Sequence, residues 1–312
     1  MSTNNRSTRS AWFAAFAAAA TLAGPALPVQ AASSPQRDFS AQKPADPSGT
    51  VEIVNVAGEV EVTGWNQPTV DVTGKLGARV ERVDVTSSAN RTTIRVVIPN
   101  GGSYSHGETE AHLKIHVPQN SSLDVSLVSA DLRTIGVGGN QHLQTVSGDI
   151  QGDVGSGSLQ VDTVSGDVHV DAHNGHNAQI KTVSGDVALN GTGGDFTLNT
   201  VSGDTIAVLN DLDHVTYQSV SGDLNLTVAT LSAQGQLDAT TISGDVKLHF
   251  AAAPDADVNA QSLSGDISNC FGPKPVESQY GPGSHLNFRS GRGGARMQVS
   301  SQSGDIAICT GK

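Results

Sequence analysis

The tripeptide Ser-Gly-Asp recurs eight times between Ser147 and Asp305, and this repeat constrains the fold more than any other feature of the sequence. A degenerate copy, Ser-Ala-Asp, precedes the eight at Ser129–Asp131. Successive copies are 18 to 22 residues apart, except for a last interval of 39 residues. A fixed short period indicates one small unit stacked many times, because each unit can bury its apolar edge only against its neighbours.

Each repeat has the pattern of two short strands joined by a corner. In Ser158–Val170, apolar and polar residues alternate on both sides of Gly166-Asp167, as in half-buried strands. Glycine permits a sharp corner, and a second glycine-rich cluster, such as Gly191–Gly194, closes the unit. A propeller blade would need about 40 residues. The sequence therefore predicts an all-β fold: a single-stranded parallel β-helix (β-solenoid) with coils of about 18–22 residues and Gly-Asp corners.

The corners are expected to stack into one structural column. Stacked carboxylates repel one another unless they are hydrogen-bonded or neutralised. We expect each aspartate to fold back onto nearby backbone N–H groups as an Asx turn, without a metal or cofactor. The alternative is Ca²⁺ bridging between coils, since Ca²⁺ takes several oxygen ligands. The column comprises Gly148, Asp149, Gly166, Asp167, Gly185, Asp186, Gly203, Asp204, Gly222, Asp223, Gly244, Asp245, Gly265, Asp266, Gly304 and Asp305.

An aliphatic residue precedes the serine in all Ser-Gly-Asp copies but one. Counting by twos from Leu159 and Val161 points Thr163 inward and Val164 outward. A change of parity near Thr163 would place the aliphatic residues in the core, and we prefer this interpretation because an exposed ladder would be an aggregation or binding surface. The alternative is a hydrophobic binding stripe. The row comprises Val146, Val164, Val183, Val201, Val220, Ile242 and Leu263, with Gln302 in the last copy.

The first 31 residues have the features of a secretory signal peptide. Arg6 and Arg9 precede an apolar run, Ala11–Ala23, and Val29–Ala31 fits a small-x-small cleavage site. The run is too short to span a bilayer, and we expect no transmembrane segment after signal cleavage. We therefore expect a signal peptide at residues 1–31, a flexible linker at 32–48, an N-terminal β region continuous with the solenoid at 49–120, and the repeat solenoid at 121–312.

The chain is acidic, which bears on its partners. Its formal net charge is −12, and loss of the two signal arginines would leave −14. A nucleic-acid-binding protein would carry a basic surface, so nucleic acid is excluded as a partner. The expected partner is an unknown ligand of the envelope or cell surface, met in the periplasm or outside the cell.

The two cysteines, Cys270 and Cys309, each lie four residues after the aspartate of a corner. In successive coils such positions lie about one strand spacing apart, which is within disulfide reach, and export would allow the bond to form. We therefore predict a Cys270–Cys309 disulfide between the final two coils. The 39-residue interval is then expected to be a normal coil with an inserted loop, Gly272–Gly294.

The histidines give no strong metal motif. Asp171, His173 and His176 could outline a site, but three loop residues without a fourth ligand are more typical of an exposed loop. His112 and His116 are expected on one face of a strand, with Lys114 between them. A cation in that position disfavours a metal.

Catalysis is also not indicated. Enzymes that act on polysaccharides need clustered carboxylates, or a base beside bound metal, in a long groove. Here the repeats are nearly uniform, and few Trp or Tyr residues could stack on sugars. We therefore predict that the chain is not an enzyme.

Three further segments accompany the repeats: Val51–Trp65, Leu76–Val83 and Gly293–Val299. The first of them contains a similar corner at Gly58-Glu59. Over about residues 49–310 the combination resembles a bacterial family of exported β-strand-repeat proteins that carries the label “putative adhesin” (domain of unknown function 4097). The resemblance implies a right-handed β-helix-like solenoid, an adhesive role, and no catalytic residues to transfer.

The sequence thus predicts an exported, non-enzymatic β-solenoid that acts as an adhesin or as a structural or binding module of the bacterial cell envelope. A glycan-binding or polysaccharide-degrading β-helix protein is the first alternative. An accessory protein in envelope-stress signalling is the second.

Overall fold

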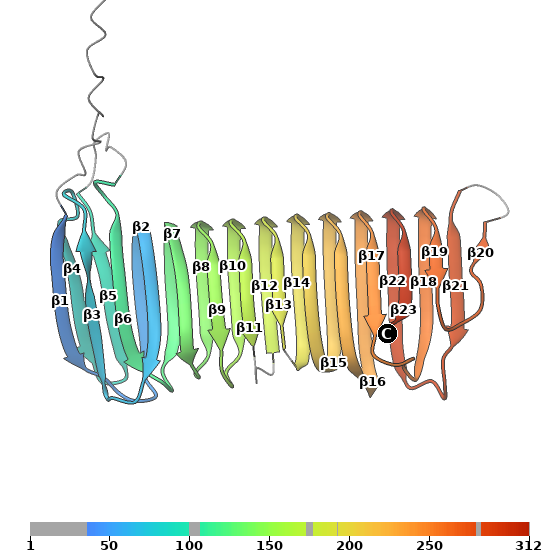
Figure 1. The fold of residues 1–312 in the computed structure, drawn as a ribbon, viewed down its shortest axis with the longest axis horizontal. Coiled ribbons are helices and arrows are strands. Elements are labelled where there is room, and N and C mark those ends of the chain that lie inside the picture. The colour runs from blue at the N-terminus through green and yellow to red at the C-terminus, as the bar shows by residue number, and fades with distance from the viewer. Residues whose placement is uncertain (1–35, 100–106, 173–176, 192, 279–281, 312) are drawn as a thin grey trace, which may run out of the picture. The chain divides into compact units, whose positions relative to one another are not determined.

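The fold consists of β-strands only. The computed structural model describes residues 36–99, 107–172, 177–191, 193–278 and 282–311, and these residues form 23 strands and no helix (Figure 1). Consequently, the described part of the chain holds no helix that is long and apolar enough to cross a membrane. The all-β prediction is confirmed, and the architecture is a solenoid-like stack of strands.

Each central coil is a pair of strands that meet at a Ser-Gly-Asp corner. Two longer strands, β15 (Thr205–Ser221) and β16 (Leu224–Ser243), run unbroken through the opposite corner into the following coil. The strands of the central coils are β8 (Gln141–Ser147), β9 (Ile150–Val154), β10 (Leu159–Ser165), β11 (Val168–Ala172), β12 (Asn177–Ser184), β13 (Val187–Asn190), β14 (Gly194–Ser202), β15 (Thr205–Ser221), β16 (Leu224–Ser243) and β17 (Val246–Phe250).

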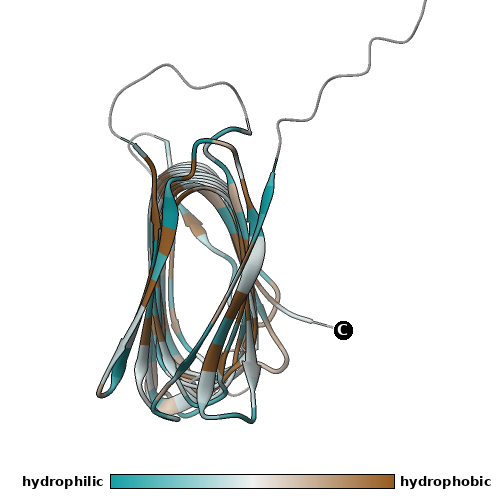
Figure 2. Ribbon diagram, turned by 90° about the vertical axis from the view of Figure 1, so that its left-hand side faces the viewer, coloured by the Kyte–Doolittle hydropathy of each residue, from teal (hydrophilic) through white to brown (hydrophobic). Residues whose placement is uncertain are grey.

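Neighbouring coils pair in parallel and in the register of the repeat. Leu159 of β10 pairs with Ala178 of β12, and Ser165 pairs with Ser184. Seen end-on, the coils superpose as a flattened oval with two long sides (Figure 2). Alternate side chains of both sides point inward, so that residues such as Val161, Ile180 and Leu198 are fully buried. This apolar core holds the coils together.

At the N-terminal end, the order of the strands in space differs from their order in the sequence. Strand β2 (Thr50–Trp65) forms a coil that lies between β7 (Ser122–Val137) on one side and β5 (Arg91–Val97) and β6 (Ala111–Pro118) on the other, all in parallel. Antiparallel strands complete this end: β4 (Arg82–Ser88) on β5, β3 (Thr69–Leu76) on β6, and β1 (Arg37–Pro44) on β3.

Strand β1 corrects one expectation. Residues 32–48 were expected to be a flexible linker, but Arg37–Pro44 is a strand paired with β3 along its whole length. Phe39 and Ala41 alternate with polar residues, and Phe39 packs against the core. Pro44 is the last residue of the strand, so the N–H groups of the alternating residues before it can pair. The proline content of residues 32–48 therefore misled the prediction.

The C-terminal end shows a second exchange of order. Strands β22 (Ala295–Ser303) and β23 (Ile306–Thr310) lie between the coil of β16 and β17 and the coil of β18 (Ala256–Ser264) and β19 (Ile267–Asn269). Strand β21 (Ser284–Arg289) runs antiparallel to β18 and carries β20 (Val276–Glu277) on its other side. The expectation of a normal coil with a loop at Gly272–Gly294 is therefore wrong. The segment adds a strand to the end of the stack, and the chain then returns one coil inward.

Candidate functional site

The Gly-Asp corners lie above one another and are linked by a ladder of hydrogen bonds. In each coil the backbone N–H of the corner aspartate donates to Oδ1 of the equivalent aspartate in the adjacent coil, over 2.8–3.0 Å. The ladder starts at Asp131 and ends in the order Asp245, Asp305, Asp266. The carboxylates were expected to accept hydrogen bonds within their own corner. Instead, Oδ1 accepts a hydrogen bond from the backbone of the adjacent coil. The aspartates are therefore part of the scaffold.

The glycines of the corners allow the coils to approach closely. Gly185 has φ +128°, and a Cβ atom there would lie 2.2 Å from the carbonyl oxygen of Gly166 in the preceding coil. Gly203 and Gly222 stack in the same way. The corner thus needs glycine both for its backbone conformation and for the space between coils.

The residues before the serines form an exposed aliphatic row. Val164 is 48% exposed and Val183 is 47% exposed, whereas the preceding threonines, Thr163 and Thr182, are buried. The preferred prediction, which placed the row in the core, is wrong; the row lies on the surface, as the alternative of a hydrophobic binding stripe requires. The aliphatic row comprises Val128, Val146, Val164, Val183, Val201, Val220 and Ile242, in adjacent coils. Leu263 is also exposed, but the coil of Gln302 separates it from Ile242.

The inward threonines explain this parity. The Oγ1 hydroxyl of Thr182 donates to the carbonyl oxygen of Ser184 over 3.2 Å, and that of Thr200 donates to Ser202 over 3.2 Å. A hydrogen bond of this kind offsets the cost of burying a hydroxyl group. In these coils strict alternation can therefore continue up to the corner, and the next residue, valine, points outward. The equivalent Thr145 and Thr241 are buried without such a hydrogen bond within the described residues.

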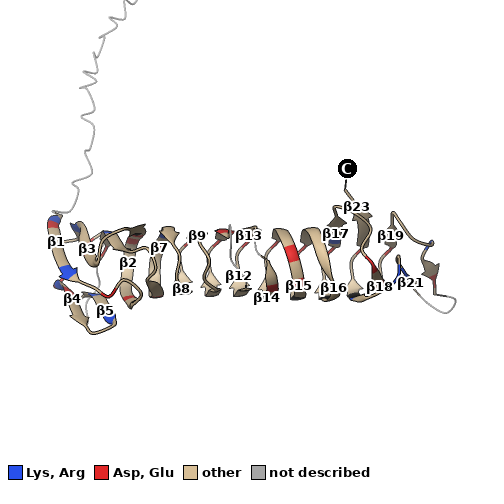
Figure 3. Cartoon of the chain, turned by 90° about the horizontal axis from the view of Figure 1, so that it is seen from below, with Lys and Arg blue, Asp and Glu red and all other residues tan. Residues whose placement is uncertain are grey.

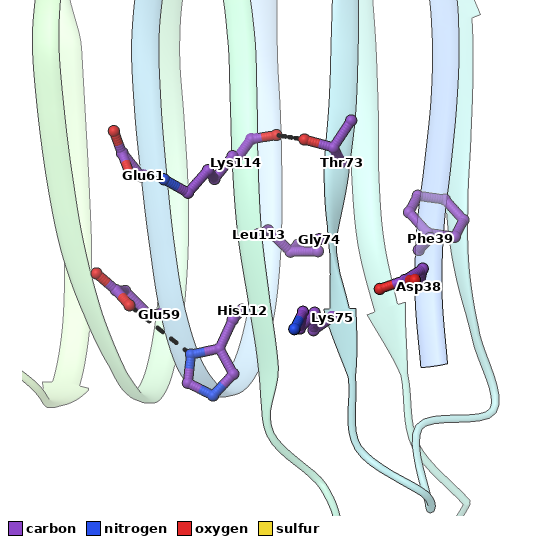
Figure 4. Close-up of a pocket in the computed structure, with 10 residues that line it drawn as sticks. All are labelled: Asp38, Phe39, Glu59, Glu61, Thr73, Gly74, Lys75, His112, Leu113 and Lys114. Atoms are coloured by element: carbon purple, nitrogen blue, oxygen red, sulfur yellow. Dashed lines mark hydrogen bonds and ion pairs between the residues drawn. The ribbon is translucent and has the colours of Figure 1, made fainter. Parts of the chain in front are cut away.

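A second surface feature is a cleft of about 490 Å³ at the N-terminal end, over β1, β3, β6 and β2 (Figure 4). Phe39, Gly74 and Leu113 provide its apolar part. Charged groups surround it: Lys114 Nζ lies 3.2 Å from Glu61 Oε2, and His112 Nδ1 lies 3.7 Å from Glu59 Oε2. The remaining lining residues are Asp38, Thr73 and Lys75. The cleft joins segments distant in the sequence, so no local pattern could reveal it.

The histidines do not form a metal site among the described residues. His112, Lys114 and His116 point to the outer face of β6, where they lie beside Glu59, Glu61 and Thr63 of β2. His173 and His176 lie outside the described residues. No three His, Cys, Asp or Glu side chains gather as a ligand set in the part of the chain that the structure describes.

Cys270 and Cys309 occupy equivalent positions in adjacent coils, with Cα atoms 4.8 Å apart, and are joined by a disulfide. One detail of the expectation is corrected. The coil of Cys309 is last in the sequence but lies one coil in from the end of the stack. The bond therefore fastens the outermost complete coil, that of β18 and β19, to its inner neighbour.

Basic residues are concentrated toward the ends of the stack (Figure 3). Between Arg133 and Lys247 the sequence contains one Lys or Arg, namely Lys181. Near the C-terminal end, Arg289 of β21 donates to Asp257 of β18 over 2.6 Å, and this contact lowers the pKa of Asp257. The central coils thus present a surface with few cations, on which the aliphatic row runs.

Comparison with known proteins identifies the family to which this chain belongs. A family model described as Toastrack DUF4097 matches residues 46–309. The chain belongs to this family. The family resemblance drawn from the sequence is thereby confirmed, and it covers nearly all of the stack. No curated protein sequence matches the chain.

Several solved structures are similar at low identity. A putative adhesin from Bacteroides fragilis NCTC 9343 is 11% identical, with a TM-score of 0.41, over 87% of this chain and 97% of its own. A putative adhesin from Parabacteroides distasonis ATCC 8503 is 12% identical, with a TM-score of 0.36 and the same coverage. A putative lipid binding protein from Parabacteroides distasonis ATCC 8503 is 10% identical, with a TM-score of 0.37, over 89% of this chain and 97% of its own.

Proposed function

We propose that this chain is an exported, non-enzymatic adhesin-like module of the bacterial cell envelope that binds its partner through the aliphatic row. The observation that carries the proposal is the row itself, in which seven aliphatic side chains stand exposed in consecutive coils. The largest apolar patch on a typical monomer covers about 300–600 Å², and such patches often bind a partner. The stack holds these side chains at one strand spacing, so little conformational entropy is lost on binding.

The scaffold proposed for this role is a single-stranded parallel β-helix with coils of about 18–22 residues, which the repeat spacing and the parallel pairing of successive coils support. A scaffold role also fits the corner aspartates, whose Oδ1 atoms accept backbone hydrogen bonds from adjacent coils. Export rests on the signal-like segment at residues 1–31.

Retention on envelope fractions tests the proposal. The full chain is incubated with sedimented membranes and with peptidoglycan, and the bound fraction is compared with that of Val164→Asp. The matched control is Val208→Asp, because Val208 is a 42% exposed valine outside the aliphatic row. We expect retention by the wild type and by the control, and at least tenfold weaker retention by Val164→Asp. Equal retention by all three proteins would contradict the proposal.

A glycan is the second candidate ligand, and the cleft favours it. Phe39 lies beside hydrogen-bonding groups such as Thr73 and Lys75, and small-molecule sites combine an apolar wall with a few polar groups in this way. Titration of oligosaccharides into the wild type and into Phe39→Ala tests this candidate. Binding that is independent of Phe39 would remove the cleft as the glycan site.

A further inference from the structure

The residues beside the aliphatic row carry information about the partner. Two positions before each member of the row, an outward residue forms a second line, here called the central polar row: Ser126, Gln144, Asp162, Lys181, Asn199, Gln218 and Thr240. Only Asp162 and Lys181 are charged, and they lie in adjacent coils, paired across the strands. The aliphatic row and the central polar row are therefore uncharged except for one acid and one base at their middle.

Lys181 is not used by the fold. No ion pair of Lys181 occurs within the described ranges, although it is the one Lys or Arg between Arg133 and Lys247. The carboxylate of Asp162 is instead contacted by Gln160 Nε2 at 2.9 Å and by His142 Nε2 at 3.4 Å. The cation next to the aliphatic row is thus available to a carboxylate of another molecule.

We propose that the aliphatic row binds the same row of a second copy of this chain, in an antiparallel pair. A two-fold axis parallel to the strands would pass between the coils of Val164 and Val183. It would reverse the order of the coils and keep each strand position, as a self-complementary interface requires. Val164 then faces Val183 of the second copy, and Asp162 faces Lys181 of the second copy. This inference rests on the proposed function, because it names the partner of the same surface.

The two charges select this register over its neighbours. An axis through the coil of Val164 would place Asp162 opposite Asp162 of the second copy. An axis through the coil of Val183 would place Lys181 opposite itself. Axes farther along the row leave both charges opposite neutral residues. One register therefore makes two ion pairs, and the adjacent ones make like-charge contacts, which disfavour them.

The outer line of the same face is compatible with this register. Asp124 meets Thr216, His142 meets Thr197, and Gln160 meets Gln179 of the second copy, according to their positions in the paired strands. None of these pairs joins like charges. Farther out, Glu52 would approach Asp238, but Arg91 lies 2.8 Å from Glu52 and neutralises it.

The row also fits a second copy in its spacing. Both rows repeat at one strand spacing, about 4.8 Å, so in this register the six members from Val128 to Val220 each meet one member of the same row of the second copy. The exposed part of the row amounts to on the order of a few hundred Å², so the interface falls at the small end of specific protein interfaces, below about 1,200 Å². We therefore expect a weak dimer that dissociates on dilution.

Charge reversal tests the arrangement. Sedimentation velocity over a concentration series follows the full chain, Asp162→Lys, Lys181→Asp, and an equimolar mixture of these two variants. We expect the wild type to dimerise, each variant alone to dissociate at least tenfold more readily, and the mixture to associate at least as tightly as the wild type, since each of its facing pairs joins opposite charges. Val164→Asp should be monomeric, and Val208→Asp should behave as the wild type. Melting temperatures verify that the variants fold.

Three results would overturn the inference: a wild type that stays monomeric throughout the series, a mixture of the two charge variants that does not associate, or equal weakening by Val164→Asp and Val208→Asp. The envelope assay separates this inference from the proposed function. A monomeric wild type whose envelope retention depends on Val164 would refute pairing and leave the function standing. A wild type that dimerises but is not retained on envelope fractions would refute the proposed function and leave pairing standing.

Discussion

Replacement of Gly185 by alanine tests the physical basis of the stack. Gly185 lies in a central coil with its neighbours Gly166 and Gly203 at the same corner. At φ +128°, a residue with a Cβ atom is strained, which costs about 1–3 kcal/mol. The Cβ would also lie 2.2 Å from the oxygen and 2.8 Å from the carbon of the Gly166 carbonyl group, and neither is a flexible side-chain end.

Relief of this overlap requires the two coils to move apart at the corner. The movement weakens the hydrogen bond from the Asp186 N–H to Asp167 Oδ1, which is 2.9 Å long, and a hydrogen bond of this kind contributes about 1 kcal/mol. Together with the backbone strain, we expect Gly185→Ala to lower the free energy of unfolding by about 2–4 kcal/mol. Because coils are stabilised by their neighbours, the loss should appear as earlier unfolding of the central coils.

Urea unfolding followed by circular dichroism measures this loss. Ser184→Ala is the matched control, because its side chain is exposed at the same corner, and it should change the free energy of unfolding by less than about 0.5 kcal/mol. Asp186→Asn keeps an Oδ1 acceptor and should stay within about 1–2 kcal/mol of the wild type. If Gly185→Ala were as stable as Ser184→Ala, close contact between corners could not be what requires glycine.

Three further predictions concern the disulfide, the column and a buried tyrosine. Thiol titration of the unfolded, unreduced chain should find no free thiol, and two per chain would refute the Cys270–Cys309 bond. A chelator should leave the melting temperature unchanged, whereas a sharp fall would favour Ca²⁺ at the aspartates. Burial raises the pKa of Tyr217. Deprotonation of Tyr217 therefore costs more free energy in the folded state than in the unfolded state. Its contribution to the free energy of unfolding is complete below the ordinary pKa near 10 and is lost as the pH rises through the raised pKa. Tyr217→Phe should move alkaline unfolding to higher pH, and an unchanged midpoint would contradict this assignment.

The repeat carried most of the information that could be read from the sequence. The alternation around Gly166-Asp167 predicts two strands and a corner, and the pairing of Ser165 with Ser184 follows the repeat spacing. The order of the last coils was not predictable in this way. Ser243 pairs with Ser303 and not with Ser264, the next copy in the sequence, and Ser303 lies between the two. Coils with the same corner sequence are nearly interchangeable as neighbours. Only side-chain packing over the whole coil distinguishes them.

The orientation of the aliphatic row shows a second limit. Burial of Val164 in place of Thr163 would satisfy the hydrophobic effect locally, and on that ground the prediction went wrong. It neglected hydroxyl groups that bond to corner carbonyl oxygens, as those of Thr182 and Thr200 do, and so tolerate burial. The cleft was missed for a different reason, since Phe39 and Leu113 approach only through strand pairings between distant segments.

The ends of the stack decide in which direction copies of this chain can associate. A parallel stack exposes unpaired strand edges at both ends, and such edges recruit further strands. Here antiparallel strands cover them: β1, β3 and β4 at one end and β21 at the other. The outer strand β1 carries Arg37, Lys43 and Pro44, and charge and proline discourage further pairing. End-to-end growth is therefore disfavoured, while the aliphatic row along the side stays uncovered. Any association driven by the scaffold's own surface is thus expected to be lateral, as in the proposed antiparallel pair.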